Sequence, residues 1–156
     1  CRLAAVGVLR ALGFMSVPAS PEPFVLSIAS DLAEARRVQS EIEQVLHQVS
    51  AFSEREIFAI KLAVEEALVN AIKHGNQMDR AKKVHVTYHV HADRFEVQIT
   101  DEGPGFDPDD VPDPTAPENL ERPCGRGLLL MRSYMTEVVY QDKGRAVRMA
   151  KVRKSG

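Results

Sequence analysis

The sequence contains little cysteine, with only Cys1 and Cys124 in 156 residues. Two cysteines so far apart form no disulfide framework, and their separation is not typical of a metal site. Scarce cysteine is a feature of proteins from reducing compartments. We therefore expect a cytoplasmic protein.

Long apolar runs and a surplus of one charge are also missing. No stretch approaches the roughly 20 apolar residues of a membrane helix, so we expect no membrane partner. The formal net charge is −2, with 20 basic and 22 acidic residues scattered along the chain. This balance argues against direct binding to nucleic acid, whose phosphates favour a basic surface. What remains is an ordinary globular composition, 44% apolar and 27% charged, which suffices for one domain with a core.

The first residues do not fit the rest of the chain. Their mildly apolar, mildly basic stretch is interrupted by Gly7, Arg10 and Gly13, which makes it a poor signal peptide. Residues 17–23 contain three prolines and are typical of a linker. We expect a disordered leader and linker over residues 1–22 and one domain over residues 23–153.

Apolar periodicity predicts eight elements in that domain. Alternation predicts strands at 24–28, 84–90, 95–99, 136–141 and 145–152. Helical spacing predicts helices over 31–49, 53–74 and 127–135. The order β-α-α-β-β-loop-α-β-β predicts an α/β fold of the α+β kind, a two-layer sandwich with a mixed, mostly antiparallel sheet.

Local signals refine these elements. Asp31 is a candidate N-cap, and Ser53 with Glu56 forms a capping box. Gly75 is expected to end the second helix as a C-terminal glycine usually does. In the strand 84–90 we expect the valine and tyrosine side chains to fall in opposite registers around a polar stripe.

The first segment with evident chemistry includes Glu66 and Asn70, late in the second predicted helix. Because they are four residues apart, they share one helix face. Their neighbours are apolar, and burying an amide there without a partner costs roughly 2–7 kcal/mol. A hydrated Mg²⁺ fits, because it takes one or two protein oxygens and bridges to substrate phosphates. Taken alone, the segment is equally compatible with two side chains that face solvent.

The second segment, Asp101-Glu-Gly103-Pro-Gly105, directly follows a predicted strand. Its glycines permit tight turns and the close approach of a flat ligand to the backbone. Asp101 can accept hydrogen bonds from an exocyclic amine such as that of adenine. An acid followed by glycines is also common in plain turns.

The third segment, Gly125-Arg126-Gly127, stands where the long loop 102–124 meets the last predicted helix. Glycines before a helix N-terminus leave backbone N–H groups free for phosphate oxygens. Arg122 and Arg126 add positive charge for the same anion. This pattern alone is weak, because glycine is a common N-cap.

Together, the three segments resemble the N box and the two glycine boxes of the GHKL ATPase superfamily, which has the Bergerat fold and includes gyrase B, histidine kinases and MutL. The match covers about residues 24–152. The form E-A-x-x-N-A-x-x-H-G is typical of anti-sigma factor serine/threonine kinases of the RsbW and SpoIIAB type. The run L-E-R-x-x-G-R-G-L at 120–128 resembles the end of their ATP lid.

The resemblance implies roles in binding ATP and Mg²⁺. Glu66 matches the general base, and Asn70 matches the Mg²⁺ ligand. Asp101 matches the adenine contact, in a pocket shaped by Gly103 and Gly105.

Further matches concern the phosphates. Gly125 and Gly127 match the phosphate-binding turn, and Arg122 matches the catalytic lid arginine that reaches the terminal phosphate. Arg126 stands at a variable position of that turn. The cofactor-binding set also includes Lys73 and His74 of the first box.

The resemblance implies a protein serine/threonine kinase that phosphorylates a STAS-domain anti-sigma antagonist, binds a sigma factor and forms a homodimer. The alternative is a non-catalytic, ATP-dependent binding module for a regulatory partner. A histidine kinase is a weaker alternative, because His47 is the sole histidine ahead of the first box. His85, His89 and His91 favour a solvent-facing strand, because we see no Cys or acid placed to complete a metal site.

Overall fold

The computed structural model describes residues 22–105 and 123–154. Most of the predicted leader, the loop residues 106–122 and Arg122 with them lie outside the described residues. The elements are β1 (Phe24–Ala29), α2 (Leu32–Val49), α3 (Glu54–Asn70), a π-helical turn η1 (Ala71–Gly75), β2 (Lys83–Val90), β3 (Arg94–Thr100), α4 (Pro123–Tyr134), β4 (Glu137–Gln141) and β5 (Ala146–Val152). Their order confirms the predicted one, with η1 as the addition.

The five strands form one sheet in the order β1-β2-β3-β5-β4, and all four neighbouring pairs are antiparallel. The expected mixed sheet is therefore wrong, and the connections explain why. Short hairpins join β2 to β3 and β4 to β5, and a hairpin reverses the chain. Helices α2 and α3 lead away from the end of β1 and back again, so β2 starts beside the end of β1 and runs in the opposite direction. Among strands that follow one another along the chain, only β3 and β4, joined through α4, run in the same direction, and β5 lies between them.

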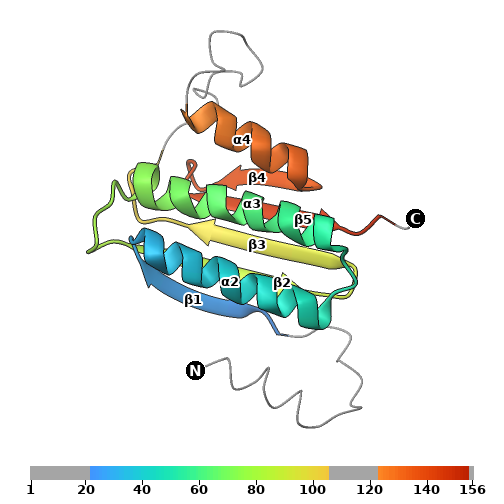
Figure 1. The fold of residues 1–156 in the computed structure, drawn as a ribbon. Coiled ribbons are helices and arrows are strands. Elements are labelled where there is room, and N and C mark those ends of the chain that lie inside the picture. The colour runs from blue at the N-terminus through green and yellow to red at the C-terminus, as the bar shows by residue number, and fades with distance from the viewer. Residues whose placement is uncertain (1–21, 106–122, 155–156) are drawn as a thin grey trace.

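The three helices cover one face of the sheet, with α3 between α2 and α4 (Figure 1). Val84, Val86, Tyr88 and Val90 all point into this layer and are buried. The expectation that the valines and the tyrosine fall in opposite registers is wrong, because alternate residues of a strand share one face. Cross-strand partners continue the core: Tyr88 lies opposite Phe24 and Val97, and its ring stacks on Phe24 at 4.7 Å between centroids.

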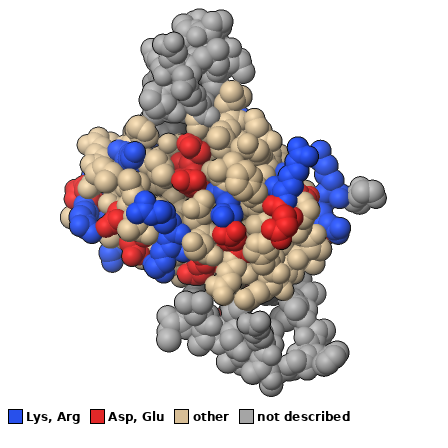
Figure 2. All heavy atoms as spheres, in the orientation of Figure 1, with Lys and Arg blue, Asp and Glu red and all other residues tan. Residues whose placement is uncertain are grey.

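The other face of the sheet is polar and faces away from the helices. Its middle row runs from Thr87 through Gln98 to Arg148 across three strands. Figure 2 shows the opposite, helix-bearing side of the molecule, where acidic and basic side chains are interspersed and neither sign forms a continuous patch. No helix in the described part of the chain has the length and apolarity to cross a membrane.

Helix α3 does not end as the sequence predicts. After Asn70 the chain makes the π-helical turn, closed by a hydrogen bond from the N–H of Asn76 to the Ala71 carbonyl at 2.8 Å. Gly75 lacks the expected positive φ; the positive φ angles after this turn are 54° at Gln77 and 60° at Met78. A π turn accommodates one extra residue and re-aims the side chains that follow it. Another constraint must therefore account for glycine at position 75.

The capping box at the start of α3 yields a stability prediction. Ser53 Oγ accepts the Glu56 N–H at 3.2 Å, and Glu56 Oε2 accepts the Ser53 N–H at 2.8 Å. We expect Ser53→Ala to lower the free energy of unfolding by about 0.5–2 kcal/mol. The Glu56 N–H loses its acceptor, and the reciprocal bond from the residue 53 N–H to Glu56 loses the geometry of the capping box. Urea denaturation followed by circular dichroism measures the change. Ser40→Ala, at an exposed position within α2, is the control, and an equal loss there would contradict the prediction.

Candidate functional site

Glu66 and Asn70 lie on the face of α3 that meets α4. A Cβ atom built on Gly127 of α4 would lie 2.7 Å from Glu66 Oε2 and 3.2 Å from Asn70 Nδ2. The two side chains therefore share a face, and both are half-buried. Among the described residues neither forms a hydrogen bond or an ion pair. A carboxylate and an amide thus meet a closely approaching helix backbone with their polar atoms still available.

Asp101 follows β3 and lies against the end of the π turn. A Cβ atom on Gly75 would lie 2.3 Å from Asp101 Cγ, and one on Gly103 would lie 1.9 Å from the Gly75 carbonyl oxygen. These two approaches, and not a positive φ, require glycine at both positions. Glycine at position 75 is therefore required by the close approach of Asp101, and not by the helix ending that the sequence predicts.

The Asp101 carboxylate is held in a particular electrostatic setting. Its residue is only 9% exposed, and burial raises the pKa of the carboxyl above its ordinary value. The N–H of Gly103, 2.8 Å from Oδ1, and the charges of Arg145 and Lys82 oppose that rise in the pKa. No other described residue donates a hydrogen bond to this carboxylate. Its second oxygen can therefore accept a hydrogen bond from a ligand N–H.

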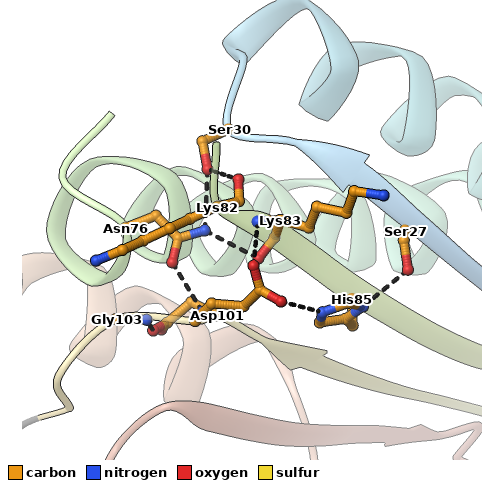
Figure 3. A network of polar contacts seen from close by, with 9 residues as sticks. Ser27, Ser30, Asn76, Lys82, Lys83, His85, Asp101 and Gly103 are labelled. Atoms are coloured by element: carbon orange, nitrogen blue, oxygen red, sulfur yellow. Dashed lines mark hydrogen bonds and ion pairs between the residues drawn. The ribbon is translucent and has the colours of Figure 1, made fainter. Parts of the chain in front are cut away.

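Asn76 holds this end of the fold together, a role that its sequence context does not predict. It is fully buried (0% exposed), and its Nδ2 donates to Ser30 Oγ and to the Lys83 carbonyl, both at 2.9 Å. Its Oδ1 accepts the Glu102 N–H at 2.8 Å. One amide thus joins the β1–α2 connection, the start of β2 and the segment after β3 (Figure 3). The only sequence signal was an asparagine directly after the glycine of the first box.

Glu102 extends the same network across the open face of the sheet. Its Oε1 accepts the Lys83 N–H at 2.7 Å, and its Oε2 lies 3.0 Å from His85 Nε2. His85 Nδ1 lies 2.7 Å from Ser27 Oγ on β1. The network places Glu102 on the side of the backbone away from Asp101, so the two neighbouring carboxylates have different surroundings.

The β4–β5 hairpin reaches the same region. Gly105 has a φ of 79°, and a Cβ atom there would lie 2.5 Å from the Lys143 carbonyl oxygen and 3.2 Å from Arg145 Nε. The Arg145 carbonyl accepts the Asp101 N–H at 2.9 Å. Arg145 Nε is buried and has no hydrogen-bond partner among the described residues. Arg145 therefore belongs to the surroundings of Asp101, although nothing in its sequence position indicated this.

Two predicted site residues lie differently from the expectation. Helix α4 begins at Pro123, four residues before the predicted start, so Gly125 and Gly127 lie inside the helix and not in a turn ahead of it. Proline is favourable at the first position of a helix, which explains the earlier start although the sequence places Pro123 in the expected loop. Gly125 falls in the first turn, where N–H groups lack partners within the helix. Gly127 lies beyond that turn and instead allows α4 to approach Glu66.

The remaining predicted residues are not brought into this cluster by described contacts. Lys73 and His74 are exposed on the π turn. Arg126 lies in the first half of α4, with its side chain outside the described set, and Arg122 precedes the helix in the undescribed segment. The described contacts thus form two groups: Glu66 and Asn70 of α3 meet Gly127 of α4, and Asp101 after β3 meets Gly75 and Gly103.

Comparison with known proteins defines this class of site. The sequence model of the histidine kinase-like ATPase domain matches residues 28–151, so the chain belongs to that family. The serine-protein kinase RsbW of Listeria innocua is 34% identical over 65% of this chain and 69% of its own length. The serine-protein kinase RsbW of Bacillus licheniformis is 36% identical over 64% of this chain and 67% of its own length. Within the ATPase family, these relatives identify the branch of the serine-protein kinases.

A solved structure shares the fold. The crystal structure of the RsbU and RsbW domains of Rv1364c from Mycobacterium tuberculosis matches 86% of this chain with a TM-score of 0.58 at 15% identity. The chain spans 32% of that longer protein. This likeness confirms the α/β architecture of the domain.

Asp101 and Glu102 should change the pH dependence of folding stability in opposite directions. The raised pKa of Asp101 means that folding disfavours its ionised form. The protein is therefore more stable with Asp101 protonated, and this stability is lost as the pH rises through the folded-state pKa. The backbone N–H of Lys83 and then His85 lower the pKa of Glu102, so its contribution is present at neutral pH and lost on acidification. At pH 7 we expect Asp101→Asn to raise the melting temperature and Glu102→Gln to lower it.

Both differences from the wild-type protein should shrink as the pH falls toward 3, because a growing fraction of each carboxyl group is protonated in the folded and the unfolded states. Differential scanning calorimetry of the two variants between pH 3 and pH 8 measures this. Each isosteric variant is the control for the other, because the residues are adjacent. Shifts of the same sign at pH 7 would contradict the electrostatic assignment.

Proposed function

We propose that this chain binds ATP with Mg²⁺ and transfers the terminal phosphoryl group to a serine or threonine of a partner protein. The observation that carries the proposal is the assembly of Glu66, Asn70 and Asp101 with Gly75, Gly103 and Gly127 in a member of the histidine kinase-like ATPase family. Relatives that are 34–36% identical are named serine-protein kinases, which favours a protein hydroxyl as the acceptor.

The adenine end of the nucleotide is proposed to lie at Asp101. Adenine offers an exocyclic amine as donor, and the second oxygen of this carboxylate has no donor among the described residues. Gly103 and Gly75 allow the surrounding backbone to come close to a flat ring. The raised pKa of Asp101 predicts that nucleotide binding weakens on acidification earlier than an ordinary aspartate would cause, because the protonated oxygen loses acceptor capacity.

The phosphate end is proposed to lie between α3 and the start of α4. Asn70 fits Mg²⁺, because its amide supplies one hard oxygen ligand and the ion keeps several waters while it bridges to substrate phosphates. When bound, Mg²⁺ offsets the negative charge of the phosphates. The N–H groups of the first α4 turn, which include that of Gly125, are oriented for an anion. Lys73, His74, Arg122 and Arg126 stay predicted cofactor-binding residues from the resemblance.

Glu66 is proposed as the general base. Its carboxylate would take the proton of the acceptor hydroxyl while that oxygen forms a bond to the terminal phosphorus and the bond to the ADP oxygen breaks. Its partial burial and lack of a described ion pair leave it free to accept a proton. Arg122, which lies outside the described residues, is proposed from the resemblance to stabilise the terminal phosphate.

The acceptor is proposed to be a small STAS-domain anti-sigma antagonist, with a sigma factor as a second binding partner. The naming of the relatives supports this choice, and phosphorylation at a protein interface would add charge there and release the partner. The expected homodimer and the cytoplasmic location stay predictions, as do the domain limits 23–153.

Nucleotide binding is tested first. We expect Asp101→Asn to weaken Mg-ATP binding by about 10- to 100-fold, because the amide replaces an acceptor of the adenine amine with a donor. Isothermal titration calorimetry with Mg-ATP at pH 7.5 measures the dissociation constant. Glu102→Gln is the matched control, because that side chain faces His85 and Lys83. An unchanged affinity of the Asp101→Asn variant for Mg-ATP would contradict the proposal that adenine binds at Asp101.

Phosphoryl transfer is tested separately. Wild-type protein with radiolabelled ATP and STAS-domain proteins from its source genome should label one of them on a serine or threonine. We expect Glu66→Gln to slow transfer by about 10²–10⁴-fold while retaining ATP binding. The control is Glu65→Gln, which alters the exposed neighbouring carboxylate. Tight ATP binding without transfer by the wild-type protein would favour the binding-module alternative, and transfer by Glu66→Gln at the wild-type rate would contradict the assigned base.

A further inference from the structure

Two histidines and a glutamate converge on the open face of the sheet, where β2 turns into β3. His89 is the penultimate residue of β2, His91 follows that strand, and Glu96 of β3 is the cross-strand partner of His89. One ligand atom from each of the three residues lies within 4.8 Å of the others. From the sequence, no acid is expected to complete a metal site here. That expectation is wrong, because the antiparallel register places Glu96 beside His89 although seven positions separate them.

We propose that His89, His91 and Glu96 form a binding site for a divalent transition-metal ion, with Zn²⁺ as the best match. Two imidazoles and one carboxylate are typical zinc ligands at bond lengths of about 2.0–2.2 Å. Ligand atoms around one such ion are roughly 3.5 Å apart, so small rotations of three half-buried side chains would close the site. The imidazoles select against Mg²⁺ and Ca²⁺, which prefer oxygen ligands.

Arg94 supports the site by orienting its carboxylate. Arg94 Nε and Nη2 both contact Glu96 Oε1, at 2.9 Å and 2.8 Å. The same arginine therefore fixes the plane of the carboxylate without occupying Oε2. Such a partner behind a metal ligand is common, because it holds the ligand in the orientation that binding needs. The centroids of the His89 and His91 rings lie 4.0 Å apart, so both imidazoles are already close enough to bind one ion.

The proposed metal site is separate from the candidate nucleotide site. Glu96 and Asp101 lie near opposite ends of β3, and five residues of an extended strand span roughly 17 Å. An ion held by three ligands of one hairpin would cross-link β2 to β3 at their turn. It would stabilise the folded chain without entering the nucleotide pocket, so the proposal does not depend on the function proposed for that pocket.

The test is a ZnCl₂ titration of nucleotide-free protein by isothermal titration calorimetry, with a parallel measurement of the melting temperature. The thiols of Cys1 and Cys124 are first blocked with iodoacetamide, because free thiols bind zinc. We expect one ion per chain and a melting temperature that rises by several degrees, because the ion binds the folded state. His91→Ala and Glu96→Gln should each weaken binding by about tenfold or more. In the absence of zinc, the melting temperature shows whether each variant folds.

The matched control is His47→Ala. His47 lies on α2 beside Glu43 and Glu54, at 3.8 Å and 3.3 Å through different ring nitrogens. It therefore reports on nonspecific binding by a surface histidine near carboxylates, and its loss should leave the zinc affinity unchanged. The proposal is overturned if wild-type protein binds no zinc in a saturable manner, or if His47→Ala weakens binding as much as His91→Ala and Glu96→Gln do.

Discussion

The buried Asp101 carboxylate lies against the backbone of Gly75, and most of the geometry of the candidate site follows from this contact. Any side chain at position 75 would occupy the place of the carboxylate. The contact joins the end of the helix that carries Glu66 and Asn70 to the end of β3, two segments far apart in sequence. Asn76 fixes the junction through the Glu102 backbone. The end of the α3 segment and the end of β3, which carry the residues of the candidate site, are thereby held together.

The same junction explains why two adjacent carboxylates differ. Asp101 turns inward, where burial disfavours its charge, while Glu102 turns outward, where an N–H group and His85 favour its charge. An acceptor that is incompletely paired in the ligand-free protein gains most from a ligand that donates hydrogen bonds to it. The structure therefore keeps the unfavourable charge where adenine is proposed to bind, and uses the favourable one to attach the loop to the sheet.

Much of this architecture could be predicted from the sequence, because it rests on short-range patterns. Alternating Val84, Val86, Tyr88 and Val90 indicate a strand, and Ser53 with Glu56 indicates where α3 begins. The π turn could not be predicted, because the local pattern of Ala71–Gly75 suits the end of an ordinary α-helix equally well. The start of α4 at Pro123 was missed, because proline also suits a loop. Asn76, Arg145 and Glu96 acquire their roles only through tertiary contacts and strand register, which no local pattern contains.

The π turn after α3 makes the length of this segment as important as its composition. It contains one residue more than a regular α-helical turn would need. Deleting a single residue between Ala71 and Gly75 would allow ordinary helix geometry and would preserve most of the apolar stripe. The π turn takes up its extra residue with nearly the rotation of an ordinary α-helical turn, so such a deletion would leave the direction of the following chain nearly unchanged. It would shift the register of residues 71–75 by one position, so different side chains of the turn would meet the core while Gly75 could still face Asp101.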